Sequence, residues 1–484
     1  MTAFQRRATF CAIAIVSLAL PNIYPRFMSP NEYVRLYTAR AIVESHSLHI
    51  DRYLGRPSPA SVSDVAYFRG HFYADKAVGM SLAAIPGVVI ARIIAPSASV
   101  LMQLFAARLF AVTIPALLAL WFVLRRARSP IDGIVIAGLF LGSVIFPQAL
   151  GLTGHLPMTI AICAAAVLLA RDELPASRVA IAGLLPGAAI LIDFTSGIAA
   201  LGLLIVVAAK TKSIRKIVTF AICCAAIASV QLAVNAICFD GPLDFAYHHE
   251  FNPADQANRA GTLFGIGVPH LDATWGLTVG RMQGIFVHSP FLLFAIPGAW
   301  LALRRKRDAI RIWAIAVCLA YFYLNCTLPD WEGGWALGPR YLTLIYPLLA
   351  WFVIDGGVKP AATPLLIVAV TWSVLLHMAA MLTWSMPPHW RFLSFPDLEL
   401  SAYLLFRGVF GPNLLVWIGV PAAIAAILLV ALALSAIVVN SGKANVAYVV
   451  VGALVFAIAL SAVAPPDGSF VAEAYKPIFA FMGR

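Results

Sequence analysis

Charged side chains are scarce in this chain of 484 residues. Asp, Glu, Lys and Arg make up 12% of the sequence, hydrophobic residues make up 61%, and the mean hydropathy is +0.88. Soluble globular domains carry about 25% charged residues, so this composition excludes a water-soluble protein. The sequence also lacks a Gly-rich nucleotide-binding fingerprint of the Rossmann or P-loop type.

Cysteine is also sparse, and its seven residues form no pair with metal-ligand spacing. All seven lie within or at the ends of apolar runs, where cysteine usually serves as a small packing residue. Cys238 and Cys326 are both expected near one face of a membrane, so a single disulfide between them is the alternative.

What the sequence does contain is apolar runs of about 20 residues, the length that crosses a hydrocarbon core of about 30 Å. Such runs should be helices, because backbone polar groups in lipid must be satisfied internally. The sequence therefore predicts an all-α integral membrane protein, 1–484 forming one polytopic domain. About thirteen spans are expected, at 8–24, 100–124, 131–149, 155–170, 178–193, 195–209, 217–238, 288–303, 310–328, 341–355, 361–383, 414–439 and 446–464.

The placement of lysine and arginine predicts the orientation. With the N-terminus in the cytoplasm, the short inner loops receive eighteen Lys and Arg residues against five Asp and Glu, and the rest of the chain has sixteen against seventeen. The net charge of +12 is thus a topology signal and gives no reason to expect nucleic acid as a partner. We expect a multi-pass protein of the bacterial inner membrane, surrounded by membrane lipids. No small-residue cleavage site follows 8–24, which is interpreted as a retained span.

The outer side is expected to carry the chemistry, because its loops are long and polar: 25–99, 239–287 and 384–413, with a compact loop at 329–340. The first of them opens with a helix start in which Ser29 is the predicted N-cap and Glu32 the capping-box acid. The helix should run to about Glu44 and lie along the membrane surface.

Later in the same loop, Asp75 and Lys76 precede an apolar stretch at 78–95 that lacks a basic cluster at its far end. This stretch is interpreted as a second helix that dips into or lies along the membrane. A helix N-terminus beside a lysine is suited to binding phosphate.

Three motifs carry a resemblance to a known superfamily. Asn31-Glu32 with Arg35, followed by the Gly-x-x-Tyr-x-Asp-Lys stretch at 70–76, is similar to the first outer loop of GT-C glycosyltransferases. Protein O-mannosyltransferases and the bacterial aminoarabinose transferase that modifies lipid A belong to this group. Residues 281–290 and 325–342 resemble elements of uncharacterised bacterial members. Asn31 stands where the acidic pair usually has its first Asp, which leaves the identity of the base, or activity itself, open.

The resemblance implies an inverting transfer of a sugar from polyprenyl phosphate to a hydroxyl on a glycan, lipid or protein acceptor. A carboxylate must take the hydroxyl proton, and fixed positive charge must stabilise the departing phosphate. Glu32 is the first candidate for the base and Asp75 the second, with Asp64 in reserve. Lys76, Arg35 and Arg340 are the candidates for phosphate and donor binding. Instead of acting as the base, Asp75 could hold Lys76 or a divalent metal ion, and the sequence leaves the need for a metal open.

Further candidates have simpler interpretations beside the functional one. The possible substrate contacts are His155, Trp331, Glu332, Trp335 and Arg281, with Arg259 a weaker candidate. The favoured interpretation of His155 is an interfacial histidine satisfied by backbone, and that of Trp331 and Trp335 is the aromatic belt. Arg108 is a functional candidate because it lies inside a predicted span. Asp64 is otherwise a solvated loop acid, and Asp193 should pair with a nearby base. His248-His249-Glu250 with Asp244 nearby suggests a metal site, but a solvated loop is the favoured interpretation.

Two other classes of protein compete with the enzyme. A flippase or transporter of a lipid-linked sugar would also be polytopic, but such proteins usually contain internal repeats and interrupted helices at the midplane, and no convincing repeat is found. A membrane scaffold would not need Glu32, Asp75, Lys76 and Arg340 together on one side.

Overall fold

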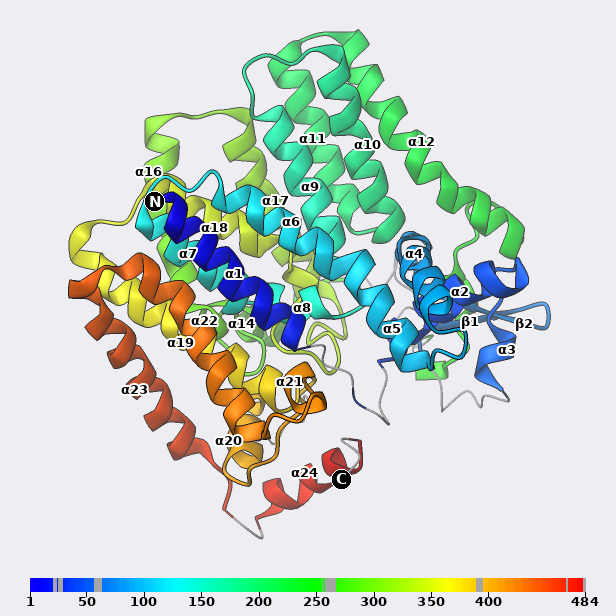
Figure 1. Cartoon of the computed structure of the whole chain (residues 1–484). Coiled ribbons are helices and arrows are strands. Elements are labelled where there is room, and N and C mark those ends of the chain that lie inside the picture. The colour runs from blue at the N-terminus through cyan, green and yellow to red at the C-terminus, as the bar shows by residue number, and fades with distance from the viewer. Residues whose placement is uncertain are drawn as a thin grey trace.

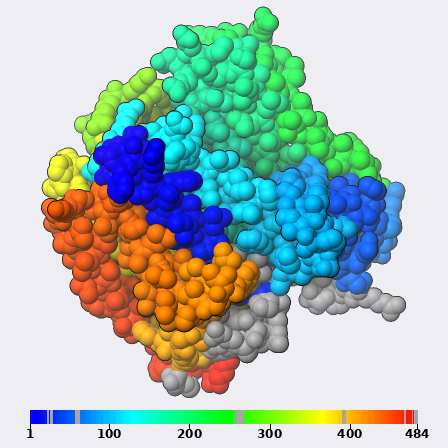
Figure 2. All heavy atoms as spheres, viewed as in Figure 1, coloured from blue at the N-terminus to red at the C-terminus, as the bar shows by residue number. Residues whose placement is uncertain are grey.

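The computed structural model describes residues 1–20, 24, 29–55, 63–254, 256, 267–388, 395–466 and 469–481. Arg259 and parts of all three long loops lie outside these residues. The chain folds as a body of packed helices from which the first long loop projects at one edge (Figure 1). In the space-filling view this loop forms the blue lobe beside the green end of the long helix 214–238 (Figure 2).

The α-helices have the following bounds: α1 Ala3–Ala19, α2 Pro30–Ser45, α3 Asp51–Leu54, α4 Gly79–Ile94, α5 Val100–Arg108, α6 Ile114–Leu124, α7 Pro130–Leu141, α8 Ile145–Leu150, α9 His155–Leu169, α10 Ala176–Ile192, α11 Ser196–Thr211, α12 Ile214–Cys238, α14 Leu271–Thr278, α15 Ile285–His288, α16 Ala295–Arg305, α17 Ala309–Thr327, α18 Ile345–Gly356, α19 Thr363–Leu382, α20 Pro396–Leu405, α21 Leu414–Trp417, α22 Ala422–Ser441, α23 Val446–Val463 and α24 Phe470–Phe481. The other elements are strands β1 Val65–Phe68 and β2 His71–Ala74, a π-helical turn η1 Leu109–Thr113, and 3-10 turns η2 Ala246–His249, η3 Pro290–Phe294, η4 Arg340–Leu342, η5 Pro360–Ala362 and η6 Lys443–Asn445.

The all-α membrane fold predicted from composition is confirmed, and every predicted apolar segment overlaps a helix. Within the described residues, six stretches are long and apolar enough to cross a membrane: 100–124, 214–238, 309–327, 360–382, 422–441 and 443–463. Six further apolar helices are shorter: 79–94, 130–141, 155–169, 176–192, 196–211 and 345–356. The total of thirteen spans stays a prediction.

Two segments predicted as single spans are broken. The segment 131–149 is split into α7 and α8 at Gly142, where an added Cβ would lie 2.8 Å from the Ser373 side chain of α19. The segment 414–439 is interrupted between α21 and α22, because Gly419 adopts a φ of +93° and Pro421 precedes the new helix. Backbone conformation and close helix contact therefore override continuous hydrophobicity at both positions.

A β-hairpin in the first loop was not predicted. Strands β1 and β2 pair antiparallel through a two-residue turn, in which Arg69 has a φ of +47° and Gly70 a φ of +91°. Two-residue hairpin turns favour positive φ at both positions, for which Asn-Gly is the usual signal. Arginine is uncommon at positive φ, so the dipeptide Arg69-Gly70 does not indicate this turn.

The loops predicted to be cytoplasmic contact one another in pairs. The N-terminal ammonium and Arg6 donate to the carbonyls of Arg128 and Ala127, respectively. Lys210 donates to carbonyls at the end of α9, and Arg311 forms a bidentate ion pair with Asp355. These contacts join loops that the sequence predicts to lie on the same side of the membrane. Which side that is stays a prediction.

Helices α16 and α18 cross with almost no space between their backbones. A Cβ added at Gly298 would lie 2.2 Å from the carbonyl oxygen of Phe352, and one added at Gly356 would meet Gly298 itself. Small residues allow this kind of backbone approach in membrane helices.

We expect Gly298→Ala to destabilise the protein by about 1–3 kcal/mol, the usual cost of overpacking. Thermal unfolding in detergent measures the change. Gly197→Ala is the matched control, because this helical glycine has nothing within 4 Å of an added Cβ. Equal melting temperatures for the two variants would contradict the close crossing.

Candidate active site

The hairpin brings two carboxylates to one lysine. Val65 pairs with Ala74 in the β1–β2 register, so Asp64 and Asp75 lie opposite each other at the open end of the hairpin. The backbone N–H of Asp75 donates to the Asp64 carbonyl at 3.2 Å. The Lys76 ammonium lies 2.7 Å from a carboxylate oxygen of each acid, and its side chain is 13% exposed.

The charges of this group stabilise one another. Burial by itself would lower the pKa of Lys76, but the carboxylates of Asp64 and Asp75 raise it well above its usual value. Burial would likewise raise the pKa of Asp64, and the Lys76 ammonium instead lowers it. Lys76 is therefore a fixed cation. Asp64 had been interpreted as a solvated loop acid, and that interpretation is wrong because it forms this ion pair.

Two arginines extend the positive charge around the lysine. Arg35 is buried on α2 and donates to the carbonyl and side-chain oxygens of Asn31, while Arg340 starts η4. Burial lowers the pKa of Arg35, and although burial acts the same way on Arg340, its contacts with Tyr341 and the charge of Asp64 raise the pKa of Arg340. Both Nε atoms are buried, and neither has a hydrogen-bond partner among the described residues.

The turn that carries Arg340 depends on glycine. Gly333 and Gly334 have φ values of +74° and +64°, and an added Cβ at Gly333 would lie 3.3 Å from the Arg340 side chain. The chain therefore wraps closely around the base of this arginine. Gly333 and Gly334 belong to the stretch 325–342 that carries the resemblance, and this turn places them against Arg340.

His155 and Asp193 form the other polar pair at these helix ends. The Nδ1 atom of His155 lies 3.0 Å from a carboxylate oxygen of Asp193, which also accepts from Thr195. The pairing expected for Asp193 is thus present, whereas the expectation that backbone alone satisfies His155 is wrong. The His155 ring lies edge-on to Tyr341, with 5.6 Å between ring centroids, so the pair adjoins the Arg340 turn.

Glu32 has a different role from the predicted capping acid. Ser29 makes no side-chain cap hydrogen bond, and Glu32 instead forms a bidentate ion pair with Arg108 at 2.8 and 2.6 Å. The same carboxylate accepts from the backbone N–H of Leu152 at 2.5 Å. Glu32 and Arg108 are 4% and 6% exposed, respectively. The pair ties the first-loop helix to α5 beside the π-helical turn η1, a feature often found at functional sites.

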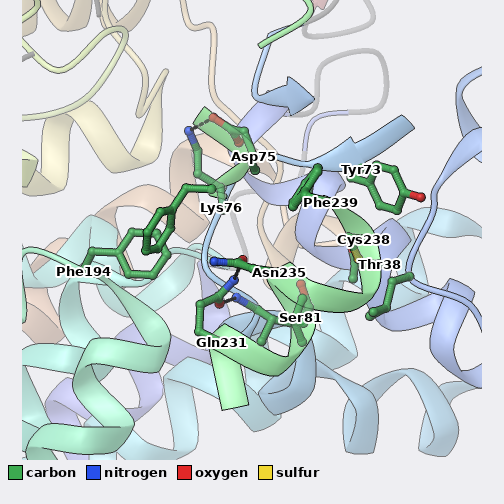
Figure 3. A pocket seen from close by; sticks show the side chains of 16 residues that line it. Thr38, Tyr73, Asp75, Lys76, Ser81, Phe194, Gln231, Asn235, Cys238 and Phe239 are labelled. Carbon is green, nitrogen blue, oxygen red and sulfur yellow. Dashed lines mark hydrogen bonds and ion pairs between the residues drawn. The ribbon is translucent and has the colours of Figure 1, made fainter. Parts of the chain in front are cut away.

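A pocket beside Lys76 opens between the hairpin and α12 (Figure 3). Asp75 and Lys76 point toward each other at one end, with Phe194 nearby, and Gln231 and Asn235 lie at the other end. Gln231 donates to Asn235 at 2.8 Å and accepts from the backbone N–H of Val78 at 2.9 Å. This contact fixes the start of α4 next to Lys76 and uses the N–H of Val78, and the phosphate site at this helix start stays a prediction.

The remaining candidates are more dispersed. Trp331 packs against Gly276 of α14, and Trp335 lies against a separate hydrophobic cluster that includes Tyr24 and Trp384. Glu332 is half-buried in the same loop, and Arg281 is exposed. The segment 281–290 contacts the loop 331–338, because the buried Gln283 donates to the carbonyl of Ala336.

Two further expectations concern cysteine and histidine. Cys238 and Cys326 are both free, as are the other five cysteines, so the alternative of a disulfide is wrong. His248 and His249 both contact Asp244, one at each carboxylate oxygen, while Glu250 is buried and bridges to β1 through Ala66. The loop is therefore more ordered than a solvated segment.

Sequence reasoning missed Tyr247, Gln231 and Asn235. Tyr247 lies with its ring 5.9 Å from the Lys76 ammonium. Gln231 and Asn235 offered a signal, since two amides four residues apart share one face of an otherwise apolar helix.

Comparison with known proteins rests on structure, because no family model and no curated protein sequence matches the chain. ArnT from Cupriavidus metallidurans bound to undecaprenyl phosphate superposes with a TM-score of 0.54 at 15% identity, over 95% of this chain and 77% of ArnT. The apo state of the same protein gives 0.51 at 14% identity, over 93% and 75%. This chain has the GT-C fold. An oligosaccharyltransferase from Archaeoglobus fulgidus also aligns, at 11% identity over 99% of this chain and 60% of that one, but its TM-score of 0.39 carries no argument.

The fold that the resemblance at 29–80, 281–290 and 331–341 implied is confirmed. At these identities the likeness extends to the fold alone. The residues that act in the chemistry must be argued from the contacts described above.

Proposed function

We propose that this protein is a glycosyltransferase that moves a sugar from a polyprenyl-phosphate donor to a hydroxyl acceptor on the periplasmic face of the bacterial inner membrane. The observation that carries the proposal is the group of three cations, Lys76, Arg35 and Arg340, gathered beside Asp64 and Asp75 in a GT-C fold. The similarity to ArnT bound to undecaprenyl phosphate supports a polyprenyl lipid as the donor's carrier.

The cations match the charge that the reaction creates. The donor phosphate is a diester with one negative charge, and the departing polyprenyl phosphate carries up to two. Groups that meet the additional charge stabilise the transition state more than the ground state. The buried Nε atoms of Arg35 and Arg340 offer two N–H donors that no described residue uses. Lys76 adds an ammonium group that stays charged.

The base is best assigned to Asp75. Glu32, the first candidate, already receives two hydrogen bonds from Arg108 and one from Leu152, so its carboxylate oxygens are occupied by protein donors and are less available to an acceptor hydroxyl. Asp75 lines the pocket and shares Lys76 with Asp64. When a donor phosphate draws the ammonium toward itself, the electrostatic hold on the carboxylate weakens and its basicity increases. Asp75 then accepts the proton of the attacking hydroxyl, and the anomeric carbon inverts.

The competing function is a flippase of a lipid-linked sugar. It would use the same cations to bind phosphate, but it has no need of a carboxylate that accepts a proton. The two functions are therefore separated by the role of Asp75.

The test is a transfer assay in proteoliposomes with a panel of radiolabelled polyprenyl-phosphate sugars and a bacterial envelope extract as acceptor. We expect transfer by the wild type and a loss of about 100- to 10,000-fold in Asp75→Asn, the usual contribution of a general base. Asp272→Asn is the matched control, because Asp272 is an exposed acid on α14.

Equilibration of a donor across the bilayer without transfer would favour the flippase. Full transfer by Asp75→Asn with loss in Glu32→Gln would return the role of base to Glu32. In either case the metal dependence is read from the same assay by adding a chelator.

A further inference from the structure

Outside the proposed active site, three side chains of the first loop converge on one point. His49 follows α2, Asp51 opens α3, and His71 starts β2 at the hairpin turn. The Nδ1 atoms of His49 and His71 lie 2.9 and 2.7 Å from the same oxygen of Asp51, Oδ2. Their rings are 4.6 Å apart at an interplanar angle of 31°.

We propose that His49, Asp51 and His71 form a binding site for a divalent transition metal ion of the zinc class. Two imidazoles and one carboxylate are ligands that Zn²⁺ favours, and three protein ligands leave a fourth position for water. Zinc bonds to imidazole nitrogen and carboxylate oxygen are about 2.0–2.2 Å long, so donor atoms this close together can reach one ion after adjustment of the side chains. The three donor atoms lie within 4.8 Å of one another.

A backbone hydrogen bond orients the carboxylate of Asp51. The second oxygen of Asp51 accepts from the backbone N–H of Phe72 at 2.6 Å, and the N–H of Ile50 donates to the Phe72 carbonyl at 2.8 Å. These two bonds align the segment 49–51 with the start of β2, which carries His71. Partners of this kind orient metal ligands before the ion arrives.

A second histidine-aspartate group shows why convergence matters. His248 and His249 contact opposite oxygens of Asp244, at 3.0 and 2.8 Å, so their nitrogens do not share a centre. Within the described residues, the group around Asp51 is the one whose three donor atoms can reach a common ion. All three of its residues are at least partly accessible, which leaves the ion a path from solvent.

A bound ion would pin the hairpin turn to the junction of α2 and α3. The helix α2 carries Arg35, and β2 leads directly into Asp75 and Lys76. The ion would therefore link α2 to β2 and stabilise the first loop. The inference does not depend on the proposed function, because metal binding is measured without donor or acceptor.

The test uses the full-length protein in detergent, without a polyhistidine tag and stripped with a chelator. Zn²⁺ is titrated by calorimetry, and bound metal is counted by elemental analysis after desalting. We expect one Zn²⁺ per chain and a rise in the unfolding temperature. His71→Ala and Asp51→Asn should each weaken binding by about 100-fold or more, since even second-shell losses cost 10- to 100-fold. His248→Ala, the matched control, should bind as the wild type does.

Three results would overturn the site: no stoichiometric Zn²⁺ on the wild type, equal binding by His71→Ala, or loss of binding in His248→Ala instead. Co²⁺ substitution adds a spectroscopic check, because nitrogen and oxygen ligands give no thiolate charge-transfer band, whereas capture by a cysteine does. The metal-free variants should elute and unfold like the metal-free wild type, which separates lost binding from misfolding.

Discussion

Lys76→Met should reduce the rate of sugar transfer by about 100- to 1,000-fold, the loss that follows removal of one preorganised donor to a developing anion. Methionine keeps the length and apolar stem of the side chain and removes the charge. The proposed loss appears mainly in kcat, because the departing phosphate gains charge in the transition state and the ammonium therefore matters most there. Initial rates at several donor concentrations separate kcat from KM.

The control for Lys76→Met is Lys359→Met, which removes an exposed lysine from a loop predicted to be cytoplasmic. A structural effect needs a separate check, because the variant leaves Asp64 and Asp75 close together without their shared cation. Asp64→Asn combined with Lys76→Met relieves that repulsion, so it should restore the unfolding temperature and leave transfer low. Recovery of transfer in the double variant would show that Lys76 acts only by neutralising the acids.

Arg108→Leu should destabilise the protein by about 3–5 kcal/mol, which is the usual result of leaving one partner of a buried ion pair unpaired. Glu32 would keep its charge at a site that is 4% exposed, with only the Leu152 N–H as a remaining partner described for it. The unfolding temperature in detergent gives the measurement. Arg92→Leu is the control, because its ion pair with Glu44 is half-exposed and such pairs contribute about 0–1 kcal/mol.

The double variant Glu32→Leu with Arg108→Leu then separates the two roles of Glu32. Well-packed apolar residues often replace a buried ion pair without loss of stability, so the double variant should recover most of the unfolding temperature. If Asp75 is the base, part of the transfer activity returns with it. A stable double variant with no transfer at all would contradict the assignment of Asp75 and identify Glu32 as the acid that the reaction needs.

The local features of the site could be predicted from the sequence. Asp75 and Lys76 are adjacent, and the pattern at 29–44 predicted a helix that the structure places at 30–45. The contacts of Glu32 could not be predicted in the same way, because Arg108 is 76 positions away and the local pattern of Ser29 and Glu32 indicated a capping box. A capping pattern is a local preference, and a buried arginine opposite the carboxylate offers a stronger partner.

Long-range pairs account for the rest of the site. His155 and Asp193 lie 38 positions apart at the ends of different helices, and both had been noted without their pairing. The convergence of His49, Asp51 and His71 could not be predicted, because His71 reaches the other two only through the hairpin, whose Arg-Gly turn lacks the usual sequence signal. Residues that share a helix face can be inferred from spacing, whereas residues brought together by a turn of unpredicted geometry cannot.

The sequence by itself determined that this chain is a helical membrane protein, because hydrophobicity acts residue by residue. The distribution of lysine and arginine predicts which loops lie inside and which outside. The sequence also indicated which side chains need charged or polar partners, since Glu32, Arg108 and Lys76 are costly to bury without them. Only the tertiary structure decided which partners they took. Lys76 is shared by Asp64 and Asp75, and Glu32 is bound to Arg108, because the pairing of charges in a buried site depends on distances that strand register and helix packing set.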